Sequence, residues 1–359
     1  MVLKISDRAS GRDNNFNLIR MIAATSVLLS HAYPLAVGAD ALEPFEKILT
    51  QDHMHDNLGR VAVFAFFGIS GFFITKSFCQ KTSLREFVRA RVFRLFPALV
   101  PMSILTFLAV AWLGMSAPFL ETARVFPEYF AAILTLSFPK MLGVANLSSD
   151  IPGAFVGNPM TAVNGSLWTL PFEVMCYTLV ALAGGLGLLR RTAFFLPSLA
   201  LVLAAYFIVF QFFPDRDHRL ELLLYLGLPF AIGASFWVLR DRVPLSPVLT
   251  IILVILTVFS SGTILFRPIF CLALVHGIFV LGYARIPLIG AYNKVGDYSY
   301  GIYIYAFPVQ QLLVFHGFTG AERNILAALP VTLFLAILSW HVVEKPMLRL
   351  AHRKRGPRV

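Results

Sequence analysis

The stretch NNFNLIRMIAATSVLLSHAYP, from Asn14 to Pro34, decides how the rest of the chain is interpreted. Its apolar run is long enough for a helix that crosses the hydrocarbon core of a bilayer, which needs about 20 residues. It also carries Arg20 and His31, whose spacing is close to three helical turns, so both lie on one face roughly 16 Å apart along the axis. Such groups are costly against lipid, and they therefore predict a functional site.

The composition extends this interpretation to the whole chain of 359 residues. Hydrophobic residues make up 58% and charged residues only 14%, whereas soluble domains have about a quarter charged residues. Ten apolar segments are long enough to span or nearly span a bilayer, at 15–36, 59–79, 95–113, 167–188, 193–213, 220–239, 247–263, 266–284, 296–314 and 325–343. Long continuous apolar runs favour helices over a β-barrel. We therefore predict an all-α, polytopic transmembrane bundle of about ten spans.

The basic residues follow the topology of this bundle. When the N-terminus is placed in the cytoplasm, most of the 30 Lys and Arg residues fall on the cytoplasmic side, as the positive-inside rule requires. An even number of spans puts both termini in the cytoplasm. The net charge of +11 thus reflects topology, and we expect no nucleic-acid partner. We expect one membrane-embedded domain over 1–359, with cytoplasmic tails at 1–13 and 344–359 and a long extracytoplasmic segment at 114–166.

An arginine cluster marks the cytoplasmic edge of the third span, in LREFVRARVFRLFP from Leu84 to Pro97. Guanidinium groups bind phosphates in a bidentate way, so Arg85, Arg89, Arg91 and Arg94 suit a phosphorylated ligand. On a regular helix Arg89 and Arg91 point about 200° apart, so all four cannot face one ligand. Topology and anionic lipid head groups explain the cluster equally well.

Small residues interrupt the second span in FFGISGFFITKS. Gly68, Ser70 and Gly71 allow a helix or a ligand to approach closely. Helix packing is at least as good an interpretation as chemistry at Ser70, because the Gly-x-Ser-x-Gly turn of hydrolases is absent.

The loop at 37–58 contains Asp52, His53, His55 and Asp56. A metal or a sugar is one interpretation, but the spacing matches no known ligand pattern, so we favour a solvated polar loop. The three cysteines show no metal-binding pattern either, and we expect no metal.

The long extracytoplasmic segment leads into NGSLWTLPFEV. Pro171 cannot lie deep in a regular helix, so the fourth span is expected to begin near it. Ser166 and Trp168 then lie in a less regular approach segment, and Glu173 lies in the first helical turn. An acid at a helix N-terminus and an interfacial tryptophan are the simplest interpretation of the last two.

The last two spans carry further polar groups. GDYSYGIYIYAFPVQQ opens the ninth span with Tyr298, Tyr300, Tyr303 and Tyr305. Tyr298 and Tyr305 are seven residues apart and share a face. The tenth span ends in VEKP, with Glu344 at the cytoplasmic boundary. His276, in the eighth span, is expected to be a packed, hydrogen-bonded residue.

Taken together, these segments resemble the acyltransferase-3 family of integral-membrane acyltransferases over nearly the whole chain. The resemblance rests on five elements in order, which are Arg20-x10-His31, FFGISGFFIT at 66–75, Arg89-x-Arg91 continued by Arg94, SLWTLPFE at 166–173, and YSYGIYIYAFP at 298–308 with VEKP at 343–346. Members transfer acyl groups, usually acetyl, from cytoplasmic coenzyme A thioesters to sugars of exported glycans such as O-antigen, exopolysaccharide and lipo-oligosaccharide.

This sequence departs from the family pattern in places. Many members have Asp where Asn17 stands, and many have a histidine near Tyr305 and Ala306, where this chain has none. A second catalytic histidine is therefore excluded at that position. Some relatives carry an appended hydrolase-like domain, and this chain is expected to be the stand-alone form.

The resemblance implies roles for individual residues. His31 is the catalytic base or acyl relay, since an imidazole can accept the proton of a sugar hydroxyl that attacks a thioester or can carry the acyl group. The expected site residues are Arg20 and Glu173 with His31 for catalysis, Arg20, Arg89, Arg91 and Arg94 for acetyl-CoA, Ser166, Trp168, Glu173, Tyr298 and Tyr303 for the acceptor, and Ser70 and Glu344 in supporting roles. Glu344 is expected to pair with a basic residue of the donor site.

The expected partners are the lipid bilayer, acyl-CoA and a glycan or lipid-linked saccharide, and the expected location is the bacterial inner membrane, in a multi-pass arrangement. The alternative is a transporter or flippase for lipid-linked sugars, with Arg20 and His31 as a gate or proton relay.

Overall fold

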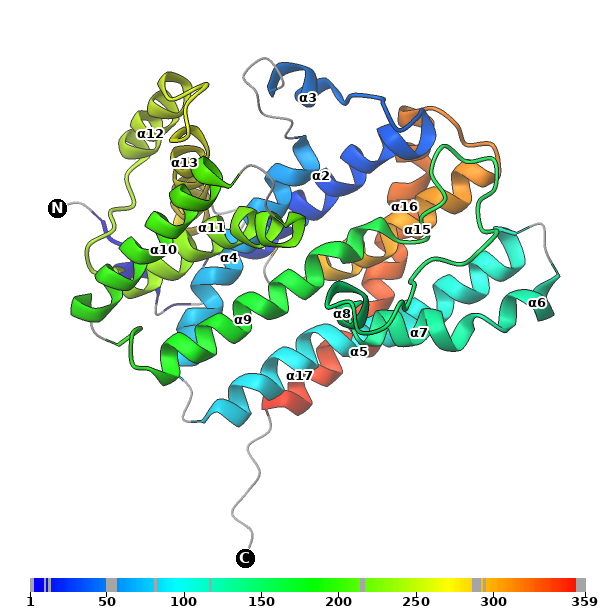
Figure 1. Cartoon of the computed structure of the whole chain (residues 1–359), viewed down its shortest axis with the longest axis horizontal. Helices are drawn as coiled ribbons and strands as arrows, with labels where there is room; N and C mark the ends of the chain where they lie inside the picture. The colour runs from blue at the N-terminus through cyan, green and yellow to red at the C-terminus, as the bar shows by residue number, and fades with distance from the viewer. Residues whose placement is uncertain are drawn as a thin grey trace, which may run out of the picture. The chain divides into compact units, whose positions relative to one another are not determined.

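The computed structural model of the chain describes residues 3–9, 11, 14–49, 57–80, 83–115, 118–190, 192–213, 217–285, 292 and 295–352. Helices dominate it (Figure 1), and apart from isolated bridges at Lys4–Pro244 and Met115–Ala154 the described residues contain no β-structure. The all-α prediction is confirmed. The loop with Asp52, His53, His55 and Asp56 and the basic tail from 353 to 359 lie outside the described residues.

Each of the ten predicted apolar segments is helical. The helices are α1 (Ser6–Ala9), α2 (Phe16–Ala36), α3 (Pro44–Leu49), α4 (Leu58–Gln80), α5 (Leu84–Leu113), α6 (Phe119–Ala123), α7 (Phe126–Leu134), α8 (Phe138–Met141), η2 (Gly165–Thr169), α9 (Leu170–Gly185), α10 (Thr192–Phe212), α11 (His218–Val238), α12 (Pro247–Phe259), α13 (Phe266–Tyr283), α15 (Ser299–Phe315), α16 (Ala321–Ser339), η4 (Trp340–Glu344) and α17 (Lys345–His352).

Among the described residues, eight helical stretches are long and apolar enough to cross a membrane. The other two predicted spans are shorter helices: α12 has 13 residues and α15 has 17. The helix that contains the predicted third span, α5, begins at Leu84, ahead of the apolar run at 95–113. Its arginine-rich N-terminal part is therefore regular helix, since backbone hydrogen bonding continues beyond the end of the apolar run.

The chain forms two compact units that are interleaved in sequence. The first comprises Met1–Ala23, Phe45–Leu84 and Phe172–Gly296, and the second comprises Ala24–Pro44, Arg85–Pro171 and Asp297–Val359. The boundary between Ala23 of the first unit and Ala24 of the second falls within the continuous helix α2.

In the first unit, α4 and α11 form the most extensive helix pair. A Cβ atom on Gly71 would lie 2.0 Å from the carbonyl oxygen of Phe230, and one on Gly233 would lie 1.9 Å from that of Gly68. Only glycine permits backbones to come this close. The glycines of the FFGISGFFIT element therefore serve helix packing, while Ser70 is half-buried.

Two other features of the first unit bear on the sequence predictions. Residues 3–9 are not a free tail, because Ile5 is fully buried and its backbone N–H donates to the carbonyl oxygen of Val243. His276 is packed as expected, with Nδ1 2.8 Å from the Thr250 hydroxyl and Nε2 2.9 Å from the carbonyl oxygen of Pro244.

In the second unit, α15 is a buried helix. Tyr298, Tyr300, Tyr303 and Tyr305 are each at most 9% exposed. Helix α16 packs closely on α15, and a Cβ on Gly301 would lie 2.7 Å from the Cα of Ala336. The long segment after α5 contains α6, α7 and α8, followed by an irregular stretch that ends at η2, as its Gly, Asn, Pro and Ser content predicts.

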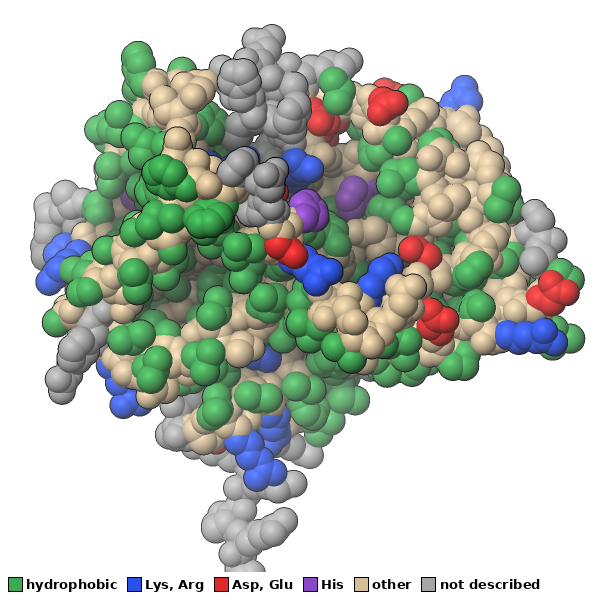
Figure 2. All heavy atoms as spheres, viewed as in Figure 1, with side chains coloured by type: hydrophobic (Ala, Val, Ile, Leu, Met, Phe, Trp, Pro, Cys, Tyr) green, Lys and Arg blue, Asp and Glu red, His purple; other side chains and the backbone are tan. Residues whose placement is uncertain are grey.

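The surface is consistent with a membrane environment. Hydrophobic side chains cover much of the face in Figure 2, with charged groups scattered between them. On α12, Val248, Val258 and Phe259 are 65%, 66% and 82% exposed. Contiguous apolar exposure on this scale is rare in soluble monomers and is typical of lipid-facing helices.

Candidate functional site

His31 lies on α2, in the part of that helix that belongs to the second unit. Its ring packs edge-to-face against the ring of Phe307 on α15, with centroids 5.2 Å apart and an interplanar angle of 78°. The Nδ1 atom is buried and has no hydrogen-bond partner among the described residues. Buried polar atoms are nearly always paired in folded proteins, so an unpaired imidazole nitrogen is a candidate for chemistry.

The segment before α9 packs against the same phenylalanine. A Cβ atom on Gly165 would lie 2.5 Å from Cε2 of Phe307, so any side chain at this position would displace the ring. The next residue, Ser166, is 1% exposed, and its Oγ has no hydrogen-bond partner within the described part of the chain. The structure therefore places His31 against Phe307 and Ser166 directly after the glycine that faces the same ring. Within the described residues, each of the two has a buried polar atom with no hydrogen-bond partner.

The local fold of this segment follows from its sequence. Asn164 caps η2 by accepting a hydrogen bond from the backbone N–H of Ser166 at 3.2 Å. Its side-chain amide also donates to the carbonyl oxygen of Ile304 on α15 at 2.8 Å. Helix α9 begins at Leu170, with Pro171 in its first turn, and the residues before it form the short 3-10 helix η2. The expected less regular approach segment is confirmed.

The tyrosines predicted to bind the acceptor are engaged within the protein. The Tyr303 hydroxyl donates to the carbonyl oxygen of Ser166 at 2.7 Å and lies 2.6 Å from the Thr169 hydroxyl. The Tyr298 hydroxyl lies 3.3 Å from Nε2 of His341. By contrast, Trp168 is 39% exposed. Tyr303 thus supports the segment around Ser166, while Trp168 offers an accessible aromatic face.

The arginines of α5 diverge, as the regular helix requires. The guanidinium of Arg89 donates to the carbonyl oxygen of Leu350 and lies 5.8 Å from the ring centroid of Phe93. That of Arg91 lies 5.7 Å from the ring of Phe87.

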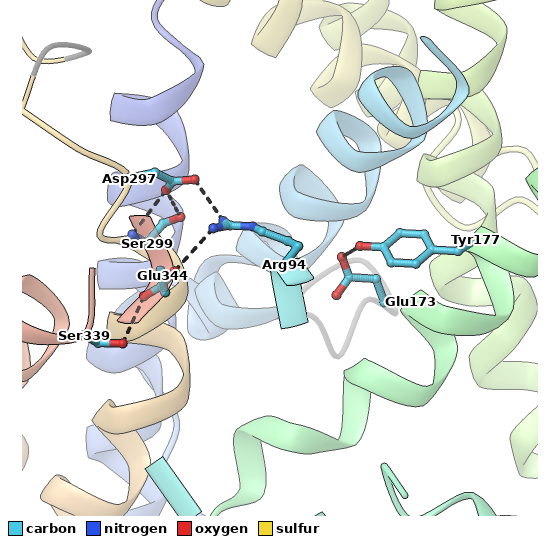
Figure 3. Close-up of polar contacts among 7 residues, drawn as sticks. All are labelled: Arg94, Glu173, Tyr177, Asp297, Ser299, Ser339 and Glu344. Carbon is cyan, nitrogen blue, oxygen red and sulfur yellow. Dashed lines mark hydrogen bonds and ion pairs between the residues drawn. The ribbon is translucent and has the colours of Figure 1, made fainter. Parts of the chain in front are cut away.

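Arg94 forms ion pairs with two carboxylates (Figure 3). Its guanidinium lies 2.9 Å from Asp297 and 3.3 Å from Glu344. Ser299 donates to Asp297 at 2.5 Å, and Ser339 donates to Glu344 at 3.0 Å. Glu344 is 2% exposed and ends the π-helical turn η4, and such turns are frequent at functional sites. The basic residue that pairs with Glu344 is thus Arg94. A phosphate bound to Arg94 would compete with the carboxylates of Asp297 and Glu344 for its guanidinium.

Three predicted residues belong to the first unit. Arg20 on α2 lies 5.6 Å from the ring centroid of Phe73 on α4. Glu173 on α9 accepts a hydrogen bond from the hydroxyl of Tyr177 one turn later (Figure 3). Ser70 is described above. Arg20 and His31 both belong to the helix α2.

Several residues of this region were not singled out from the sequence. Phe307, Asp297 and the neighbouring amides Gln310 and Gln311 have their partners far away in the chain. The sequence does contain signals for three of them. Asp297 is an acid beside a tyrosine-rich span, and Gln310 and Gln311 are amides inside an apolar helix, where such groups are costly in a membrane. Among the residues that the structure describes, no group of three His, Cys, Asp or Glu residues is placed to hold a metal.

Comparisons with known proteins agree with the sequence motifs. The family model described as an acyltransferase domain, that of acyltransferase-3, matches residues 13–343. An O-acetyl transferase of Shigella phage Sf6 is 32% identical over 352 residues, covering 94% of this chain and 96% of the relative. Nodulation protein 10 of Rhizobium leguminosarum bv. viciae is 25% identical over 391 residues, covering 96% of each. No solved structure matches the chain.

Proposed function

Because the chain belongs to the acyltransferase-3 family and is a multi-pass membrane O-acyltransferase, we propose that it moves an acetyl group from acetyl-CoA to a hydroxyl of an exported glycan. The donor is cytoplasmic, and the enzyme lies in the bacterial inner membrane. The acceptor is an O-antigen, an exopolysaccharide or a lipo-oligosaccharide, in line with what the motifs imply.

The observation that supports this proposal most directly is the arrangement around Phe307. His31 packs on this ring and Gly165 faces it, and His31 Nδ1 and Ser166 Oγ are buried without hydrogen-bond partners among the described residues. An imidazole nitrogen and a hydroxyl that have no hydrogen-bond partner in the described part of the chain are suited to a substrate that supplies one.

In the proposed reaction His31 acts as general base. The imidazole removes the proton of the acceptor hydroxyl while its oxygen attacks the thioester carbonyl carbon. The C–O bond forms, the C–S bond breaks, and the proton passes from the imidazolium to the departing thiolate of coenzyme A. An acyl-histidine relay would divide the same transfer into two steps.

The remaining residues have supporting roles in this proposal. Arg20, Arg89 and Arg91 bind the phosphates and pantetheine region of the donor, because guanidinium groups pair well with phosphate. Arg94 contributes to the donor side while held by Asp297 and Glu344. On the acceptor side, Ser166, Trp168 and Glu173 contact the sugar, and Tyr303 holds Ser166 in place through its carbonyl oxygen.

The test replaces His31 by Ala and by Gln in the purified protein reconstituted in lipid nanodiscs. Release of free coenzyme A from acetyl-CoA is measured with purified O-antigen polysaccharide as acceptor, and acetyl-CoA binding is measured separately. We expect a loss of transfer of at least about 10²-fold, the lower end for removal of a general base, with donor binding retained.

His276 provides the matched control. It is also a buried histidine of a membrane span, but both of its ring nitrogens have partners in the protein. His276→Gln is expected to lower stability while transfer by the folded fraction continues. Wild-type transfer by folded His31→Ala would overturn the proposal, and so would equal losses in the two histidine variants.

A further inference from the structure

Three residues of α15 form one ridge that carries the approach segment of the site. Tyr303, Phe307 and Gln311 are spaced four residues apart, so they lie one above another on a single helical face. Residues 158–169 run along this ridge in the opposite direction. The contacts link Gln311 to residues 158–162, Phe307 to Gly165, and Tyr303 to Ser166 and Thr169.

Gln311 holds one end of this segment with its whole amide. Its Nε2 donates to the carbonyl oxygens of Met160 and Ala162 at 2.9 and 2.7 Å. Its Oε1 and its backbone carbonyl oxygen accept hydrogen bonds from Asn158 Nδ2 at 2.9 and 3.0 Å. Gln311 is fully buried, and both donor hydrogens of its side chain are in use. A buried amide satisfied in this way fixes its partners strongly.

The neighbouring amide has different partners. Gln310 is equally buried, but its Nε2 donates to the carbonyl oxygen of Leu28 on α2 and to Oδ1 of Asn324 on α16, each at 3.0 Å. Asn324 returns a hydrogen bond to the Gln310 carbonyl oxygen at 3.1 Å. Gln310 therefore ties helices together, whereas Gln311 ties the 158–169 segment to α15.

We propose that Gln311, paired with Asn158, is a positioning residue that sets how the enzyme uses its acceptor. This inference rests on the proposed function. The segment that Gln311 holds ends in the unpaired Ser166 hydroxyl and the half-exposed Trp168, the groups that meet the acceptor in our proposal. Releasing the 158–162 end would let this surface shift against α15, and the acceptor would be bound less well.

The hydrogen bonds between Gln311 and residues 158–162, called the clamp below, should affect the acceptor selectively. The hydrogen bonds of Gln311 involve residues 158, 160 and 162 and none of the arginines of α5. The donor site should therefore keep its affinity when the clamp is removed. A general loss of packing would instead change the use of donor and acceptor together.

The experiment compares Gln311→Met with Gln310→Met, which removes an equally buried amide from the same helix. KM for O-antigen polysaccharide, KM for acetyl-CoA and the rate of acetyl-CoA hydrolysis without acceptor are measured in nanodiscs. For Gln311→Met we expect acceptor KM to rise about tenfold, the equivalent of one to two lost hydrogen bonds. Donor KM and hydrolysis should stay near wild type. For Gln310→Met acceptor KM should remain unchanged.

Asn158→Ala provides a milder second variant, since Asn158 is only half-buried. We expect it to raise acceptor KM about fivefold, and the double variant with Gln311→Met should be no worse than Gln311→Met alone. An unchanged acceptor KM in either folded variant, or a parallel change in donor KM, would overturn the inference. Failure of the proposed function is distinguishable, because wild-type protein would then acetylate no glycan.

Discussion

Gly165→Ala is the substitution that tests the arrangement around Phe307 most sharply. The added methyl carbon would lie 2.5 and 2.8 Å from Cε2 and Cζ of the ring, whereas carbon atoms normally approach to about 3.5–4.0 Å. The ring must therefore move by about 1 Å, and His31 packs on that ring. A shift of this size in a reacting group costs about 10²-fold in rate, while overpacking costs about 1–3 kcal/mol of stability.

The assay is the rate of acetyl transfer to O-antigen polysaccharide, with the melting temperature measured on the same nanodisc preparation. We expect a rate loss of about 10- to 100-fold with a melting temperature only a few degrees lower. Gly227→Ala is the control, because a Cβ on Gly227 meets nothing within 4 Å. A second change, Phe307→Leu, should relieve the clash and restore part of the rate. Wild-type rates in folded Gly165→Ala would refute the reasoning.

Three further predictions concern charge and packing. Arg94→Ala removes the guanidinium that pairs with Asp297 and Glu344. We expect a loss of about 3 kcal/mol in the free energy of unfolding, and denaturant titration should show part of it recovered when Glu344→Gln is added. Arg89 binds a donor phosphate in our proposal, so Arg89→Ala should raise KM for acetyl-CoA about tenfold. An unchanged KM for acetyl-CoA would indicate that Arg89 serves only the membrane topology. Gly233→Ala places a methyl group 1.9 Å from a backbone oxygen of α4, so its melting temperature should fall by several degrees, more than that of Gly227→Ala on the same helix.

The helices could be predicted from sequence because their signal is local. An apolar run long enough to span a bilayer specifies a helix without any knowledge of its neighbours. Helix α9 begins near Pro171, and an irregular segment precedes it. Both features follow from the geometry of proline. The apolar run at 95–113 covers only part of α5, because charged residues end an apolar run without ending the helical hydrogen bonding.

The contacts that build the site could not be predicted in this way. His31 meets Phe307, and Arg94 meets Asp297, across more than 200 positions of sequence. Hydrophobic periodicity shows which face of a helix is apolar but does not identify the helix that covers it. The packing of residues 3–9 could not be predicted for the same reason. These residues are polar enough to suggest a free tail, but they form backbone hydrogen bonds with Arg240, Val243 and Leu245.

The π-helical turn at Trp340–Glu344 has a consequence for how this protein tolerates changes in length. Ser339 and Glu344 are five positions apart and share a hydrogen bond, whereas in an α-helix such residues point about 140° apart. The turn accommodates one residue more than a regular helix would hold. Deleting Val342 would leave Ser339 and Glu344 four positions apart in a regular helix, about 40° from each other, so Glu344 should keep its direction. If the unshortened segment were instead wound as a regular α-helix, Glu344 would turn away and Arg94 would lose a carboxylate although no residue had been altered. The pairing of Glu344 therefore depends on the wide turn as well as on its own carboxylate.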